Sequence, residues 1–210
     1  LDVTDTYARD GLEHARDFYD GLGINLWRGR LYGVPYMFNT CIMIYNKTMI
    51  KEFWGKDLWE AFPDGNWDHE DFLEVARACT QDLDGDKVID QWGFWLTHRS
   101  YWYGLETQSW TRGDDCFDIP NMKYNLTSET VRQVNQDMLS WVRKEQICIG
   151  DEETAEISKA SNTAYPIFAG RVAMHIRMTP DVGTAIKSIG DRFDWDIMYL
   201  PNYGDRRSVV

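Results

Sequence analysis

Short apolar segments that suit buried strands alternate with amphipathic segments that suit helices along most of this 210-residue chain. Strands that alternate with helices are typical of an α/β fold, in which helices cover the faces of a largely buried sheet. A hairpin is predicted over residues 25–34, with its turn at Arg28–Arg30. Strands are predicted over residues 40–45, 91–96, 172–176 and 195–200. Helices are predicted over residues 5–19, 46–53, 68–78, 101–109, 128–145 and 179–189, and one more is predicted within residues 155–168.

Capping residues mark the starts of the two clearest helices. Asp68 precedes one apolar-periodic stretch and Asp71 follows three residues later, which indicates a variant capping box. Thr127 or Ser128 can cap the helix that follows them. Residues 59–67 lie between predicted helices and are predicted to form a loop.

The charge balance argues against two classes of partner. Lys and Arg number 22 and Asp and Glu number 34, so the formal net charge is −12. Nucleic acids and anionic lipid surfaces need the opposite sign. No apolar run approaches the roughly 20 residues of a membrane span. The chain starts at Leu1 without a signal peptide, so we expect it to begin inside a longer protein.

The cysteines and histidines form no familiar metal or catalytic motif. Cys79 lies on a helical apolar stripe and is predicted to be a buried free thiol, while pairing among the other cysteines stays open. The wide spacing excludes a zinc ribbon, and no metalloprotease, serine hydrolase or phosphate-loop motif occurs. The residues concerned are Cys41, Cys79, Cys116, Cys148, His14, His69, His98 and His175.

Aromatic residues are abundant, with 10 Trp, 11 Tyr and 9 Phe. Most of them are expected to pack in the core. An excess of Trp and Tyr also suits a site for a sugar, which has apolar ring faces for stacking and hydroxyl groups for hydrogen bonds.

Five segments in order resemble the bacterial extracellular solute-binding proteins of family 1, the group of maltose- and oligosaccharide-binding receptors. The segments are Leu31-Tyr32-Gly33-Val34-Pro35-Tyr36 with Ile44-Tyr45-Asn46-Lys47; Trp67-Asp68-His69-Glu70-Asp71-Phe72-Leu73; Asp82 to Asp90 running into Gln91-Trp92-Gly93-Phe94; Phe168-Ala169-Gly170-Arg171-Val172-Ala173-Met174; and Phe193-Asp194-Trp195-Asp196 leading to Leu200-Pro201. The resemblance implies a type II periplasmic-binding-protein fold with two α/β lobes around a ligand cleft.

The same resemblance implies how this chain is divided. Residues 1–38 would be part of the first lobe, residues 39–41 a hinge crossing, and residues 42–197 most of the second lobe. Residues 198–210 would form the return crossing. The chain would then be a central fragment of such a receptor.

Three segments match positions that line the cleft in this family. The first is Phe38-Asn39-Thr40, where the amide of Asn39 could bind sugar hydroxyls or instead satisfy backbone groups at a hinge. The second runs from Tyr101 and Trp102 to Trp110, Thr111 and Arg112. Trp110 resembles the sugar-stacking residue of the family, and core packing is the alternative for Trp102. Arg112 and Asp114 stand where the family has an amide and paired glycines.

The third segment is Arg177-Met178-Thr179, directly after a predicted strand. Ligands of α/β folds meet the loops at the carboxyl ends of strands. Arg177 could bind a carboxylate in a bidentate manner, which would suit an acidic sugar, or it could form a surface ion pair with one of the many carboxylates.

The acidic loop resembles a calcium-binding loop in part. Asp82, Asp84, Asp86 and Asp90 occupy loop positions one, three, five and nine, and Val88 would offer its carbonyl at position seven. Lys87 replaces the usual glycine and Gly93 replaces the usual glutamate. A structural calcium ion is one prediction, and a turn held by Asx-type bonds is the other.

The resemblance implies a monomeric, non-catalytic receptor outside the cytoplasm, periplasmic or lipid-anchored, that captures a sugar for the membrane subunits of an ABC importer and requires no cofactor. Three alternatives stay open: a glycoside hydrolase, a receptor for a polyamine or an anion, and a calcium-stabilised interaction module.

Overall fold

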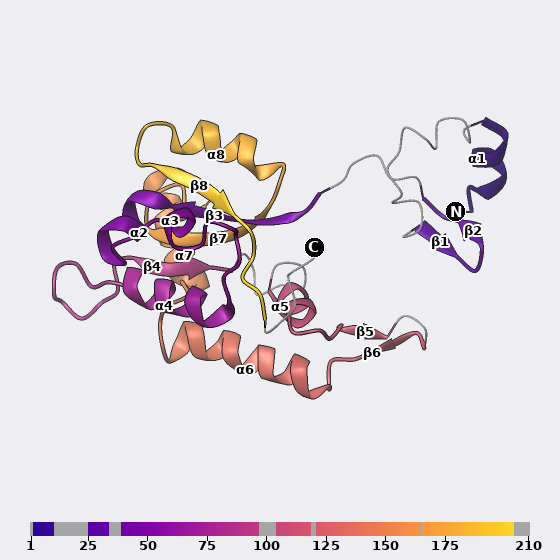
Figure 1. Cartoon of the computed structure of the whole chain (residues 1–210), viewed down its shortest axis with the longest axis horizontal. Coiled ribbons are helices and arrows are strands. Elements are labelled where there is room, and N and C mark those ends of the chain that lie inside the picture. Colours follow the sequence, from indigo (N-terminus) through magenta and orange to yellow (C-terminus); the bar gives the residue numbers. More distant parts are fainter. Residues whose placement is uncertain are drawn as a thin grey trace. The chain divides into compact units, whose positions relative to one another are not determined.

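The computed structural model describes residues 2–10, 25–33, 39–96, 104–118, 121–163 and 165–203. The chain divides into two compact units, residues 1–40 and residues 41–210. The second unit contains a four-stranded sheet with helices packed around it (Figure 1).

The described part of the first unit is a short helix and a tight hairpin. Arg28 and Gly29 have positive φ angles of 51° and 75°, as a two-residue hairpin turn requires. The turn is therefore shorter than the predicted Arg28–Arg30, because Arg30 already belongs to a strand. Residues 11–24, which include most of the predicted helix 5–19, lie outside the described residues. The elements are α1 (Thr4–Asp10), β1 (Leu26–Trp27) and β2 (Arg30–Leu31).

The sheet of the second unit has the strand order β4-β7-β3-β8. β4 runs parallel to β7, and β3 runs antiparallel to both β7 and β8. All four strands were predicted from the apolar segments. Their bounds are β3 (Cys41–Asn46), β4 (Trp92–Trp95), β7 (Val172–Met178) and β8 (Trp195–Met198).

Seven helices and a small hairpin complete the described part of this unit. The helices are α2 (Lys47–Phe53), α3 (Leu58–Ala61), α4 (His69–Cys79), α5 (Leu105–Thr111), α6 (Glu129–Arg143), α7 (Asp151–Ser161) and α8 (Asp181–Ile189). The hairpin, which was not predicted, consists of β5 (Phe117–Asp118) and β6 (Lys123–Tyr124).

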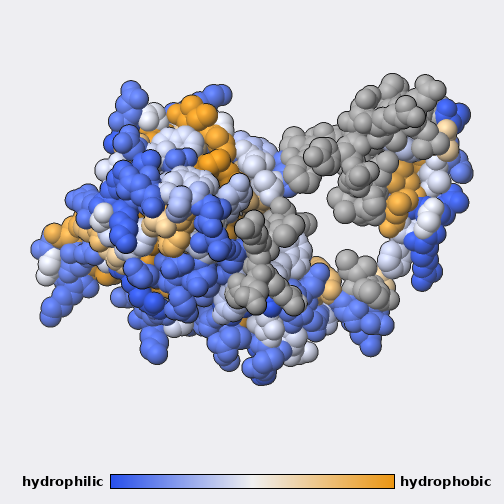
Figure 2. Space-filling view, in the orientation of Figure 1, coloured by the Kyte–Doolittle hydropathy of each residue, from blue (hydrophilic) through white to orange (hydrophobic). Residues whose placement is uncertain are grey.

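β3 shows that both faces of the sheet are covered. Met43 and Tyr45 belong to one core cluster with residues of α4 and α6, while Ile42 and Ile44 belong to a second cluster with residues of α8. Successive side chains of a strand point to opposite faces, so one strand serves both clusters. Burying each such side chain contributes about 1.5–3 kcal/mol. The hydrophilic side chains that dominate the view in Figure 2 fit this inward placement of the apolar residues.

The predicted helix caps are present. Asp68 and Asp71 form the reciprocal capping box at α4. The Ser128 side chain accepts a hydrogen bond from the Val131 backbone N–H at α6. Cys79 is a fully buried free thiol, as predicted, and Cys41, Cys116 and Cys148 are not in disulfides.

Three predicted boundaries are wrong. Residues 59–67 are not entirely a loop, because α3 forms around the buried Leu58 and the buried Asp57, which is hydrogen-bonded to Tyr45 from a distant strand. α5 ends two residues later than predicted. α7 starts earlier and ends at Ser161, where Asn162 adopts a left-handed conformation.

Candidate ligand-binding site

The candidate site lies at the edge of the main sheet where β4 and β7 end and β3 begins. Cys41 lies opposite Met178 in the β3–β7 register, so the start of one strand meets the end of the other. The Cys41 thiol forms a hydrogen bond with the Thr107 side chain of α5. Through this contact α5 packs at the same edge.

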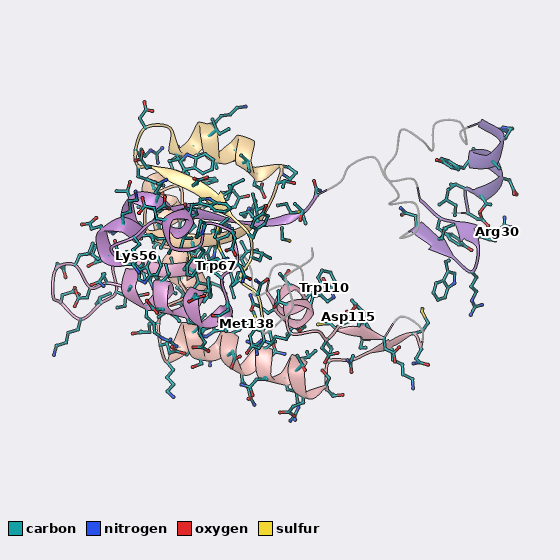
Figure 3. The ribbon with its side chains drawn as sticks, viewed as in Figure 1. Arg30, Lys56, Trp67, Trp110, Asp115 and Met138 are labelled. Carbon is teal, nitrogen blue, oxygen red and sulfur yellow. The ribbon has the colours of Figure 1, made fainter. Side chains whose placement is uncertain are left out.

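α5 has an unusual polarity for a helix packed on a sheet. Thr107, Gln108 and Thr111 are buried and Trp110 is 39% exposed. The three polar residues line a hollow of about 10 Å³ beside Ile176 of β7, which is room for about one water molecule. Figure 3 shows Trp110 extending from α5, with Asp115 on the segment that follows. The exposed group on this helix is therefore an indole ring, which suits stacking on an apolar ligand face.

Arg177 lies inside the protein and is only 7% exposed. Its Nη2 donates to the Tyr165 hydroxyl at 2.9 Å and lies 2.8 Å from Asp181 Oδ1. The guanidinium also lies 4.3 Å from the centre of the Tyr165 ring. Burial alone would lower the pKa of Arg177, but the Asp181 carboxylate outweighs it and the pKa is raised. The positive charge is thus balanced by an internal partner.

Arg112 is also used within the protein. Its side chain is 5% exposed and its Nη2 lies 2.6 Å from Asp137 Oδ2 of α6. The guanidinium lies 4.5 Å from the centre of the Tyr203 ring. Arg112 therefore joins the end of α5 to α6 and to the segment after β8.

The other predicted ligand residues fall into three groups. Met178 and Thr179 are half-buried at the end of β7. Asn39 is exposed and Thr40 is half-buried, and both belong to the end of the first unit. Phe38, Tyr101 and Trp102 lie outside the described residues. Within the second unit, the structure brings Trp110, Thr111, Met178 and Thr179 to elements that meet at one edge of the sheet.

The acidic loop gathers three of its predicted metal ligands. Carboxylate oxygens of Asp82, Asp84 and Asp86 lie within 4.8 Å of one another. Both oxygens of Asp82 accept backbone N–H groups, from Gly85 at 2.7 Å and from Lys87 at 2.8 Å.

Further bonds close the same loop. Asp86 Oδ1 accepts the backbone N–H of Val88 at 2.7 Å, and Asp90 Oδ2 accepts that of Leu83 at 2.7 Å. Lys87 has a φ of 73°, at the position where such loops usually have glycine. The donor set fits a hard cation, and the Asx-type bonds fit the alternative, so calcium binding stays a prediction.

The sequence interpretation did not single out Glu106, Thr107 and Gln108, which the structure buries on α5. Their polar character predicts exposure. A helix with polar residues on most sides has no apolar stripe to show which face turns inward. The one local signal was the position of these residues between two aromatic segments.

Comparison with known proteins identifies the family and the fold of the chain. The family model described as bacterial extracellular solute-binding protein matches residues 1–208. No curated protein sequence matches the chain significantly. Among the described residues, no helix has both the length and the apolar character needed to cross a bilayer.

Solved structures with the same fold cover nearly the whole chain. An ABC substrate-binding protein of Listeria monocytogenes in complex with cycloalternan has a TM-score of 0.70 and 15% identity, and the match covers 98% of this chain and 48% of that one. The maltose/maltodextrin-binding domain MalE of Bdellovibrio bacteriovorus, bound to maltotriose, has a TM-score of 0.68 and 17% identity. That match covers 98% of this chain and 47% of that one.

UgpB of Mycobacterium tuberculosis, in complex with glycerophosphocholine, has a TM-score of 0.70 and 19% identity. The match covers 98% of this chain and 48% of UgpB. The chain thus spans about half the length of these structures. Its α/β fold is that of type II periplasmic binding proteins, as the sequence segments indicated.

Proposed function

Because this chain belongs to the bacterial extracellular solute-binding proteins, we propose that it is part of a receptor that captures a sugar or oligosaccharide outside the cytoplasm. The receptor acts as a monomer, catalyses no reaction and delivers its solute to the membrane subunits of an ABC importer. The main observation in support is α5, which buries polar side chains and exposes Trp110 at the edge of the sheet.

A sugar suits this edge better than an anion does. The two arginines predicted to lie near the ligand, Arg112 and Arg177, have buried side chains that are paired with Asp137 and Asp181. An exposed indole ring matches the apolar face of a pyranose. Two of the compared structures hold saccharides, cycloalternan and maltotriose, and one holds glycerophosphocholine.

Nuclear magnetic resonance of the isotope-labelled 210-residue chain tests the proposal. Maltotriose, mannobiose and glycerophosphocholine are titrated separately, and a Trp110→Phe variant identifies the Trp110 indole N–H signal. We expect a saccharide to shift this signal in a saturable manner and to be recovered intact.

Two results would contradict the proposal. Release of a shorter sugar during the titration would indicate a glycoside hydrolase. A shift caused only by glycerophosphocholine would indicate a receptor for a phosphodiester. Chromatography of the recovered ligand separates the first result from simple binding.

A further inference from the structure

α5 carries a buried carboxylate, one oxygen of which has no hydrogen-bond partner among the described residues. Glu106 is 4% exposed, and its Oε2 atom is buried without a hydrogen-bond partner among the described residues. Burial and the nearby Asp115 carboxylate both raise the pKa of Glu106. A buried carboxylate without a donor destabilises the folded state, so a glutamate at this position needs a physical reason.

Other acidic groups in the same unit show what a structural role looks like. The buried Asp57 accepts a hydrogen bond from the Tyr45 hydroxyl at 2.6 Å and pairs with Lys47 Nζ at 2.6 Å. Asp114 accepts hydrogen bonds from Asn125 Nδ2 at 2.9 Å and from Ser128 Oγ at 2.6 Å. Carboxylates that shape this fold therefore have donors, and Glu106 differs from them at Oε2.

Arg112, the residue that caps the C-terminal end of α5, is not paired with Glu106. The Nη2 atom of Arg112 lies 2.6 Å from Asp137, and the guanidinium lies over the Tyr203 ring. The charged group that acts on Glu106 is the Asp115 carboxylate, which repels the ionised form of Glu106. Within the described part of the chain, no donor pairs with Glu106 Oε2 and a like charge lies nearby, which favours an incoming group that brings its own hydrogen-bond donors.

Glu106 and Trp110 are one helical turn apart, so they lie on the same side of α5. A carboxylate accepts hydrogen bonds at two oxygens, and vicinal sugar hydroxyls can donate to both. Resting on the function proposed above, we infer that Glu106 is a ligand-binding residue that accepts hydrogen bonds from sugar hydroxyl groups while Trp110 packs against the sugar ring. A position shielded from water strengthens such bonds.

The assignment has a pH signature. Hydroxyl donors favour the ionised carboxylate, whereas Glu106 in the free protein takes up a proton at a higher pH than an ordinary glutamate. Saccharide affinity should therefore weaken as the pH falls through this raised pKa. A Glu106→Gln variant cannot ionise, so its affinity should be lower at neutral pH and less dependent on pH.

The experiment compares Glu106→Gln with Glu52→Gln, which alters an exposed glutamate of α2. Affinities of the 210-residue chain for a series of malto- and manno-oligosaccharides and for spermidine are measured by calorimetry between pH 5 and pH 8. Melting temperatures are recorded for each variant. We expect Glu106→Gln to weaken saccharide binding at least tenfold at pH 7 and to leave the melting temperature unchanged or raised. Glu52→Gln should change neither quantity.

The outcomes separate this inference from the proposed function. Unchanged saccharide affinity of Glu106→Gln, with binding lost in Trp110→Ala, overturns the role of Glu106 and keeps the sugar receptor. Spermidine binding tighter than saccharide binding overturns the assignment to hydroxyl donors. If no saccharide binds the wild-type chain, both proposals fail together. If Glu106→Gln melts at a much lower temperature, the carboxylate is structural and the inference is wrong.

Discussion

α5 and α6 pack against each other, yet they are built in opposite ways. α6 buries Val131, Val134, Met138 and Trp141 on one face and turns its polar residues to solvent. α5 buries Glu106, Thr107, Gln108, Ser109 and Thr111 and exposes Trp110. The comparison indicates that α6 stabilises the unit, while α5 places polar groups and an indole ring at the edge of the sheet, as the proposed ligand-binding role requires.

The largest effect is expected from the buried face of α6. Trp141→Ala removes a ring that packs against Phe94 and His69, and should destabilise the protein by about 3–5 kcal/mol, because it leaves a cavity in the core. Urea unfolding measures the change. Leu139→Ala, at an exposed position on the same helix, is the matched control and should change stability by less than about 0.5 kcal/mol. Equal losses in the two variants would show that α6 has no distinct buried face.

His69 links the two helices, since it contacts Trp141 and lines the hollow beside Thr107. Burial, and then the Arg112 charge, lower the pKa of His69 from 6.5 to about 4. The unfolded chain takes up this proton first, so stability should fall as the pH drops from about 6.5 to about 4. The loss expected from His69 alone is about 3 kcal/mol.

Urea unfolding at a series of pH values measures this loss. A His69→Gln variant should lose less stability over the same range, because it lacks this titrating group. Part of the loss should remain, since the buried His175, whose pKa is lowered to about 3, still contributes. The same pH dependence in wild type and variant would exclude His69 as a cause.

Trp110→Ala tests whether the exposed ring of α5 contributes to ligand binding rather than to stability. The indole is partly exposed, so stability should change by less than about 1 kcal/mol. Saccharide affinity should fall by about 1–3 kcal/mol, as expected when one large side chain loses its contact with a ligand. Calorimetry and urea unfolding of the same sample separate the two effects. Full affinity in this variant would remove Trp110 from the site, and a large loss of stability would make α5 an ordinary core helix.

The smallest effect is expected at the start of α6. Ser128→Ala removes the cap that accepts the Val131 N–H at 3.2 Å and a hydroxyl that donates to Asp114. The loss should be about 1 kcal/mol, in the usual range for a helix cap. Ser128→Asp keeps an acceptor at the cap but places a carboxylate beside Asp114, so it should not restore full stability. Thermal unfolding of both variants shows whether the cap or the Asp114 bond matters more.

Local signals were sufficient to predict much of this fold. The capping residues Asp68 and Ser128 act on backbone groups only two or three residues away, and apolar runs such as residues 40–45 must be buried wherever they pack. The order of family-like segments indicated the type II periplasmic-binding-protein fold. These features depend on near neighbours in the chain or on the hydrophobic effect alone.

Contacts between distant residues decided the rest. α3 forms because Leu58 enters the core and Asp57 meets Tyr45 of β3, and nothing in residues 59–67 encodes that meeting. Arg177 is as polar in the sequence as any ligand-binding arginine, and only the packing of Tyr165 and Asp181 around it shows that its charge is already balanced. The burial of Glu106 also depends on how α5 packs, because a helix with polar residues on most sides does not specify which side turns inward.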